Sequence, residues 1–170
     1  MSILRRFDAS EESILTTQNN LVSSYGCVGR FEDALPILQD VYFGRLKLLG
    51  AQNRQTSSAA SNYASTLVHL KRFEEAKSLL RKTVPVARRA LGESNATTLR
   101  MRLIYGQSLY GDTGATLDDV REAVTTLEDA ERTARRVLGG AHPFISTIDP
   151  TLAIARGALA RRTECVRRSL

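Results

Sequence analysis

The chain has no tryptophan, and aromatic residues make up only 6% of its 170 residues. Because binding of single-stranded nucleic acid relies on aromatic rings for base stacking, so few rings argue against a nucleic-acid-binding protein. No run approaches the roughly 18 uncharged apolar residues that a membrane-spanning helix requires. Residues 1–10 have neither the long apolar stretch nor the small-residue cleavage site of a secretory signal. These absences predict a cytoplasmic protein with no membrane association.

Cysteine and histidine are also scarce. The two cysteines, Cys27 and Cys165, are far apart, and the two histidines are His69 and His142. None of the four has a second ligand at the spacing of a zinc site, and two distant cysteines do not form a disulfide framework. The sequence therefore predicts no bound metal and a reducing compartment.

Two short motifs suggest catalysis or phosphate binding only superficially. Residues Asp112–Gly114 read Asp-Thr-Gly, the tripeptide of retroviral-type aspartic proteases. That chemistry needs two such carboxylates held together in a β-rich site, whereas a single copy between helices indicates a turn. Gly139 and Gly140 are not followed by the Lys-Ser/Thr of a phosphate-binding loop. We therefore expect no enzyme, no cofactor and no small-molecule substrate.

The positive charge is concentrated at one end of the chain. The formal net charge is +6, from 24 basic and 18 acidic residues. Residues 156–168 contain five arginines and one glutamate, which is +4 of that total. Cations near the end of a helix offset its dipole, so the first interpretation is a solvated helix face. The alternative is contact with an acidic partner, or more loosely with nucleic acid or a membrane surface.

The chain does contain a long internal repeat. Residues Arg30–Ala34 (Arg-Phe-Glu-Asp-Ala) return 42 residues later as Arg72–Ala76 (Arg-Phe-Glu-Glu-Ala), and Leu49–Gly50 returns as Leu91–Gly92. The Leu-Gly pair occurs again at Leu138–Gly139, 47 residues further on, because a short segment is inserted near 111–116. A fixed period in this range is typical of stacked arrays, whose concave surfaces bind other chains.

Apolar residues recur within each unit at helical spacing, which predicts two helices per unit. The predicted organisation is one domain of about seven helices: 1–8 as the end of a preceding helix, 11–50 as repeat 1 (helices 11–28 and 31–49), 53–92 as repeat 2 (55–70 and 73–91), 95–139 as repeat 3 (96–110 and 117–138, with an inserted loop at 111–116) and 143–168 as a C-terminal capping helix. Gly50, Gly92 and Gly139 follow the second helices, where a left-handed cap is expected.

Two details of packing follow from the same pattern. The side of the first helix expected to face the core carries Ile14, Leu21, Val22 and Tyr25. Alanine recurs where the paired helices approach most closely, at Ala34, Ala76 and Ala123. Pro150 allows two interpretations: Asp149 caps a fresh helix that begins at Pro150, or Pro150 kinks one long helix. We favour the fresh helix.

The recurring residues resemble tetratricopeptide repeats, in the 42-residue form found in kinesin light chains. The resemblance covers residues 3–156. It is carried by Asn19–Leu21 in a first helix, the turn Gly29–Pro36, the Leu-Gly pairs, and His142-Pro143 before a first helix. Repeat 3 departs from the pattern, since it has Leu103-Ile104 in place of the paired asparagines. The resemblance implies an all-α, right-handed superhelical array of antiparallel helix pairs, in which the first helices line a concave groove for peptides or partner domains.

Superposition of the units places short polar and basic residues in register on the first helices. The predicted groove residues are Thr16, Asn19, Asn20, Ser23, Ser58, Ser61, Asn62, Ser65, Arg100 and Gln107, with Arg102 as a further basic residue. Asparagine amides can donate to and accept from a peptide main chain, and the arginines favour acidic residues. For Asn19, Asn20 and Asn62 a second use is open, namely hydrogen bonds between neighbouring helices of the array.

The leading functional prediction is a non-enzymatic protein-interaction scaffold that binds a protein or an acidic peptide in the groove. One alternative is a self-associating structural array, with a homodimer formed through open array ends. A third, weaker reading is binding of nucleic acid or another polyanion through the basic C-terminal helix. It is weaker because elsewhere in the chain basic and acidic residues alternate.

Overall fold

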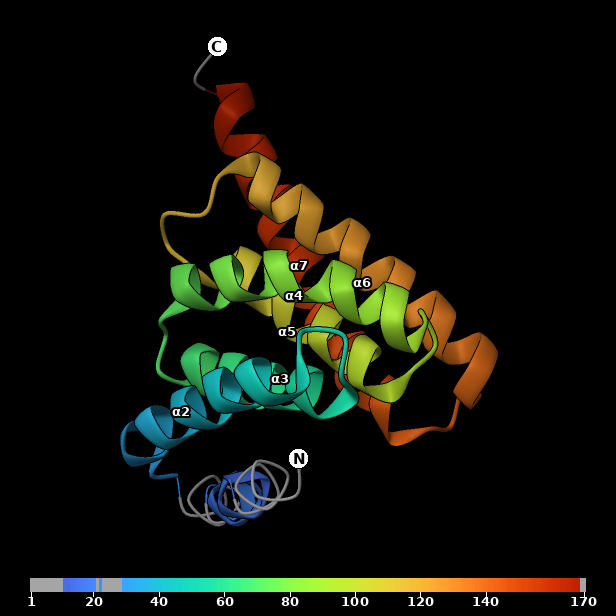
Figure 1. Ribbon diagram of the computed structural model, residues 1–170. Coiled ribbons are helices and arrows are strands. Elements are labelled where there is room, and N and C mark those ends of the chain that lie inside the picture. The colour runs from blue at the N-terminus through green and yellow to red at the C-terminus, as the bar shows by residue number, and fades with distance from the viewer. Residues whose placement is uncertain (1–10, 21, 23–28, 169–170) are drawn as a thin grey trace.

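The computed structural model describes residues 11–20, 22 and 29–168, and these residues form helices and no strand (Figure 1). Residues 11–20 are helical; then come α2 (Phe31–Leu49), α3 (Arg54–His69), α4 (Phe73–Leu91), α5 (Ala96–Gly111), α6 (Leu117–Leu138) and α7 (Pro143–Arg168).

The predicted all-α class is confirmed. The predicted second helices coincide with α2, α4 and α6, and the predicted bounds of α3 and α5 are within one residue. The predictions for residues 1–8, Leu21 and Tyr25 fall outside the described residues.

Each second helix ends at a glycine with a positive φ. At Gly92 φ is +94° and ψ is 158°, and Gly50 and Gly139 are similar. The predicted positive φ is confirmed, but ψ is extended rather than left-handed helical, because the chain leaves the helix and turns back at once. The Gly92 carbonyl accepts a hydrogen bond from the Asn95 amide at 3.4 Å, and the Asn95 side chain then caps α5 by accepting from the Thr97 amide at 2.9 Å. Glycine therefore sets the antiparallel turn between units.

Replacing Gly92 with alanine is expected to lower the free energy of unfolding by about 1–3 kcal/mol, because this backbone region is essentially restricted to glycine. A methyl group at Gly92 would have no neighbour within 4 Å, so the cost comes from the backbone alone. Gly114, which lacks a positive φ, is the matched control, and Gly114→Ala should leave stability unchanged or slightly raised. Urea unfolding of both variants makes the comparison. Equal stabilities would contradict the role assigned to Gly92.

Two sequence predictions about individual helices are wrong. Ile14 is 55% exposed, and its neighbour Leu15 is buried instead. Successive residues lie about 100° apart around a helix, so two adjacent apolar residues leave the core-facing side ambiguous.

In addition, α7 is one helix that contains Pro150, not a fresh helix capped by Asp149. Pro150 and Ser146, whose carbonyl loses its helical hydrogen bond, both lie on the exposed side. Because water can satisfy that carbonyl, the helix continues.

The first helices of successive pairs pack closely, whereas the second helices spread apart. α3 contacts α5, and α5 contacts α7, in addition to the contacts within each pair. Among the helices that the structure describes, no comparable contact joins α2 to α4 or α4 to α6. The side formed by the first helices is therefore concave, and the side formed by α2, α4 and α6 is convex. Figure 1 shows the pairs stacked from α2 to α7.

The inserted loop between α5 and α6 is attached to α7. The Arg162 side chain donates hydrogen bonds to the carbonyls of Ala115 and Asp112, at 3.1 and 3.3 Å. The Asp112 carboxylate accepts from the Gly114 amide at 2.8 Å, which forms the predicted turn. Thr116 and Asp119 form a reciprocal capping box at the start of α6. The Asp-Thr-Gly tripeptide therefore belongs to a tethered turn.

Candidate functional site

A cavity of about 240 Å³ opens on the side of the first helices. The residues that line it come from four helical segments, and they are Asn19, Val22, Phe31, Leu38, Asn62, Ser65, Thr66 and Arg100. Four of the predicted groove residues, Asn19, Asn62, Ser65 and Arg100, are thus brought together. They belong to the first helical segment, α3 and α5. Shifted by the 42-residue period into repeat 2, the four fall at positions 58, 61, 62 and 65, a spacing that puts them on one face of a helix.

Two of the asparagines hydrogen-bond to each other. The Asn62 side-chain amide on α3 donates to the Asn19 side-chain carbonyl at 3.3 Å, which links two successive first helices. The use of asparagine between helices, which the sequence left open, is therefore observed for this pair. Both residues also line the cavity, and the Asn62 amide has more hydrogen-bonding positions than this one bond uses. Asn20, by contrast, is exposed.

The bond between Asn62 and Asn19 predicts that alanine at Asn62 and alanine at Asn20 have different effects on stability. Asn62→Ala should lower the free energy of unfolding by about 0.5–1.5 kcal/mol, the usual contribution of one hydrogen bond. Asn20→Ala, at the exposed neighbouring position, should leave it unchanged within about 0.5 kcal/mol. Thermal and denaturant unfolding of the two single variants give the answer. The reverse order of stabilities would assign the structural role to the wrong asparagine.

Arg100 supplies the charge of the cavity. It is exposed, no carboxylate is among the lining residues, and no described carboxylate forms an ion pair with its guanidinium. A guanidinium without an internal partner at the edge of an otherwise neutral polar surface attracts a carboxylate. The electrostatics of the cavity therefore favour an acidic ligand group.

An aromatic side chain that the sequence-based site prediction missed, Phe31, forms one border of the cavity. Phe31, at the start of α2, stacks on His69, at the end of α3, with ring centroids 4.5 Å apart and planes inclined by 24°. His69 Nδ1 donates to the Ser65 carbonyl at 2.7 Å, which fixes the ring. Phe31 belongs to the recurring turn motif, so its recurrence was visible in the sequence, but its position in the cavity was not. Val22, Leu38 and Thr66 were also missed as lining residues.

The other predicted groove residues do not line this cavity. Thr16 and Asn20 are exposed, Ser58 and Gln107 are half-buried, and Ser23 lies outside the described residues. Two predictions are wrong because the side chains are buried: Ser61 is 2% exposed and Arg102 is 4% exposed. Each belongs to a helix packed between neighbours on both sides, so most of its circumference is covered. Arg102 instead contacts Glu93 and the Thr126 carbonyl.

Comparison with known proteins agrees with the repeat. Residues 13–89 match the tetratricopeptide repeat family. The fold resembles the crystal structure of BtubC (BKLC) from P. vanneervenii, with a TM-score of 0.71 and 18% sequence identity over 93% of this chain. The matched segment and the shared fold agree with the tetratricopeptide repeats that the sequence predicts. It spans 62% of the length of BtubC. No curated protein matches the sequence. Tetratricopeptide repeats generally mediate interactions between proteins.

The arginines of the basic C-terminal helix mostly have internal partners. Arg156 pairs with Glu128 at 2.7 Å, Arg162 binds loop carbonyls, and Arg167 and Arg168 both lie within 3.5 Å of Glu164. These contacts reduce the charge available to a polyanion. Within the described residues, no group of three or more histidine, cysteine or acidic side chains is placed to hold a metal ion. The described helices include none long and apolar enough to cross a membrane.

Proposed function

We propose that this tetratricopeptide repeat protein is a non-enzymatic interaction module that holds an acidic peptide segment of a protein partner in the cavity of the first helices. The observation that carries the proposal is the convergence of Asn19, Asn62, Ser65 and Arg100, from three successive first helices, on one cavity with no acidic residue in its lining. Asparagine amides and the serine hydroxyl match a peptide main chain, which alternates donors and acceptors. Arg100 matches an acidic side chain.

The aromatic border adds a second element of recognition. Phe31, Val22 and Leu38 supply apolar surface next to the polar residues. A peptide with an apolar residue near its acidic residue would therefore use both parts of the cavity. Action in the cytoplasm is part of this proposal and depends on the sequence alone, in which two distant cysteines indicate a reducing compartment.

The test is a peptide selection. The purified chain is used to select binders from a random peptide display library, and the affinities of the selected peptides are measured by fluorescence anisotropy. We expect acidic residues to be enriched and Arg100→Ala to weaken binding at least tenfold, about 1.4 kcal/mol. Arg89→Ala is the control, because Arg89 is an exposed arginine on α4 outside the cavity. Selected peptides that lack acidic residues, or that bind both variants like the parent, would refute the proposal.

A further inference from the structure

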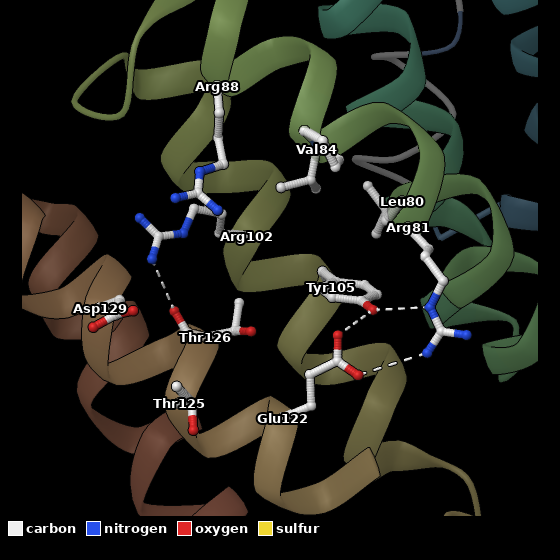
Figure 2. Close-up of a pocket in the computed structure, with 11 residues that line it drawn as sticks. Leu80, Arg81, Val84, Arg88, Arg102, Tyr105, Glu122, Thr125, Thr126 and Asp129 are labelled. Atoms are coloured by element: carbon white, nitrogen blue, oxygen red, sulfur yellow. Dashed lines mark hydrogen bonds and ion pairs between the residues drawn. The ribbon is translucent and has the colours of Figure 1, made fainter. Parts of the chain in front are cut away.

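The convex side contains a second cavity, of about 280 Å³, where α4 and α6 spread apart over α5. Figure 2 shows that charged side chains from all three helices point into it, among them Arg81, Arg88, Arg102 and Glu122. Leu80, Val84 and Pro85 of α4 form an apolar wall. The cavity is separate from the concave one, and the two share no lining residue.

The repeat itself provides a comparison for this cavity. The corresponding interval one unit earlier, between α2 and α4 over α3, is lined by Tyr42, Phe43, Tyr63 and Leu79 together with Glu74, Glu75 and Lys82. Leu46 and Ala60 line the space beside it. The 42-residue period aligns Tyr63 with Tyr105, so the common framework is kept. The same period aligns Leu46 with Arg88 and Ala60 with Arg102. Neither arginine is therefore required by the repeat, because the earlier unit packs with an aliphatic residue at both positions.

Arg102 is buried, and its contacts within the protein only partly replace the hydration of its charge. Its side chain is 5% exposed, and its guanidinium makes two long contacts, each of 3.4 Å, to a Glu93 carboxylate oxygen and to the Thr126 carbonyl. Burial lowers the pKa of Arg102, and the charge of Arg88 also lowers it, while the charges of Glu93 and Asp129 raise it. A guanidinium has five N–H donors, so this one retains capacity for a ligand. Burying a charge is costly unless it is well paired.

The acidic groups near the two arginines are shared or already engaged. Arg88 binds Glu93 at 2.6 Å, so Arg88 and Arg102 share one carboxylate. Glu122 accepts a hydrogen bond from the Tyr105 hydroxyl at 2.7 Å and pairs with Arg81. Asp129 also lies at the cavity and pairs with Arg132 at 3.8 Å. The charge of Asp129 also raises the pKa of Arg102. Neither Arg88 nor Arg102 therefore has a carboxylate to itself, because the two share Glu93 and Asp129 also pairs with Arg132.

We propose that the cavity between α4, α5 and α6 is a second binding site, which takes an acidic side chain of a protein partner. The carboxylate lies between the guanidiniums of Arg88 and Arg102, where charge-assisted hydrogen bonds are strongest. The aliphatic stem of a glutamate or aspartate packs on the wall formed by Leu80, Val84 and Pro85. This site is independent of the proposed concave groove, so one partner could contact both sides of the array.

The experiment uses N-acetyl-glutamate N-methylamide as the probe and N-acetyl-glutamine N-methylamide as its neutral match. Amide chemical shifts of the ¹⁵N-labelled chain are followed during each titration. We expect saturable shifts around Arg102 and Thr126 with the glutamate probe, a Kd in the millimolar range, and at least tenfold weaker effects with the glutamine probe. Free acetate, which lacks the stem, should also bind at least tenfold more weakly. Equal effects of the three probes, or no shifts around Arg102, would overturn the proposal.

Each of the two test substitutions replaces an arginine of the cavity with the residue at the equivalent position of the earlier repeat unit. Arg88→Leu combined with Arg102→Ala introduces the residues of the earlier unit, and it should abolish the shifts while the chain stays folded. If that pair unfolds the chain, Arg88→Leu alone, at a half-exposed side chain, should weaken binding at least fivefold. Arg89→Leu, one residue along α4, should bind like the parent. Arg100→Ala, in the concave cavity, should also bind like the parent, which separates this site from the proposed groove. Undiminished binding by the folded double variant, or loss of these shifts in Arg100→Ala, would contradict the assignment.

Discussion

Ala76→Asp is expected to lower the free energy of unfolding by several kcal/mol, enough to leave much of the chain unfolded at ordinary temperature. Ala76 on α4 is fully buried, as are its repeat equivalents Ala34 and Ala123. Alanine recurs because the paired helices approach too closely there for a larger side chain. Aspartate would bring both extra volume and a charge, and a buried charge without a partner is among the most destabilising changes known.

The matched control is Ala90→Asp, the same substitution at an exposed position of the same helix. An acid in the last turn is slightly unfavourable for the helix dipole, so about 0.3–1 kcal/mol is expected there. Denaturant unfolding followed by circular dichroism gives both values. Equal unfolding midpoints for Ala76→Asp and the parent would contradict the assigned packing of the helix pairs.

Gly106→Val should destabilise the chain by about 1–3 kcal/mol through overpacking. A Cβ atom at Gly106 on α5 would lie 2.6 Å from the Leu127 Cγ atom and 2.7 Å from its Cδ2 atom. Leu127 on α6 is fully buried, so its side chain has no space into which to move. The repeat keeps this position small elsewhere, with Ala64 in α3 and Ala153 in α7.

A double-mutant cycle tests whether contact between Gly106→Val and Leu127 causes this loss of stability. Leu127→Ala alone leaves a cavity and should cost about 2–5 kcal/mol. In combination with Gly106→Val the valine fills part of that cavity, so the double variant should be more stable than the sum of the two single effects predicts. Strict additivity would mean that Gly106 and Leu127 do not meet, and it would place the contact between α5 and α6 in error.

The repeat explains why so much of the fold could be predicted. Positions such as Gly50, Gly92 and Gly139 recur in phase, and each recurrence adds independent support for the same helix end. At the edges of the array this support is absent. Ile14 and Leu15 could not be ordered by periodicity alone, and the continuation of α7 through Pro150 depends on solvent reaching a carbonyl, which sequence does not reveal.

The sequence predicted which residues share the face of the candidate site. It did not predict which of their side chains contact one another. The period aligned the first helices, and helical spacing within the aligned units brought Asn19, Asn62 and Arg100 to one face. The bond between Asn19 and Asn62 depends on side-chain orientation across two helices, which no spacing in the sequence specifies. Superposition of the units placed Arg102 beside Arg100 among the groove residues, but two residues correspond to about 200° around a helix. It therefore belongs to the opposite side.

The most direct test of the account is to locate a bound peptide. An acidic peptide selected on the chain is titrated into the ¹⁵N-labelled protein, and the amide chemical-shift changes are mapped onto the helices. The account predicts that the largest changes fall at the lining of the concave cavity, around Asn62, Ser65 and Arg100, and that Arg100→Ala removes them. Largest changes on α7, or at the interval between α2 and α4, would contradict the concave cavity as the peptide-binding site.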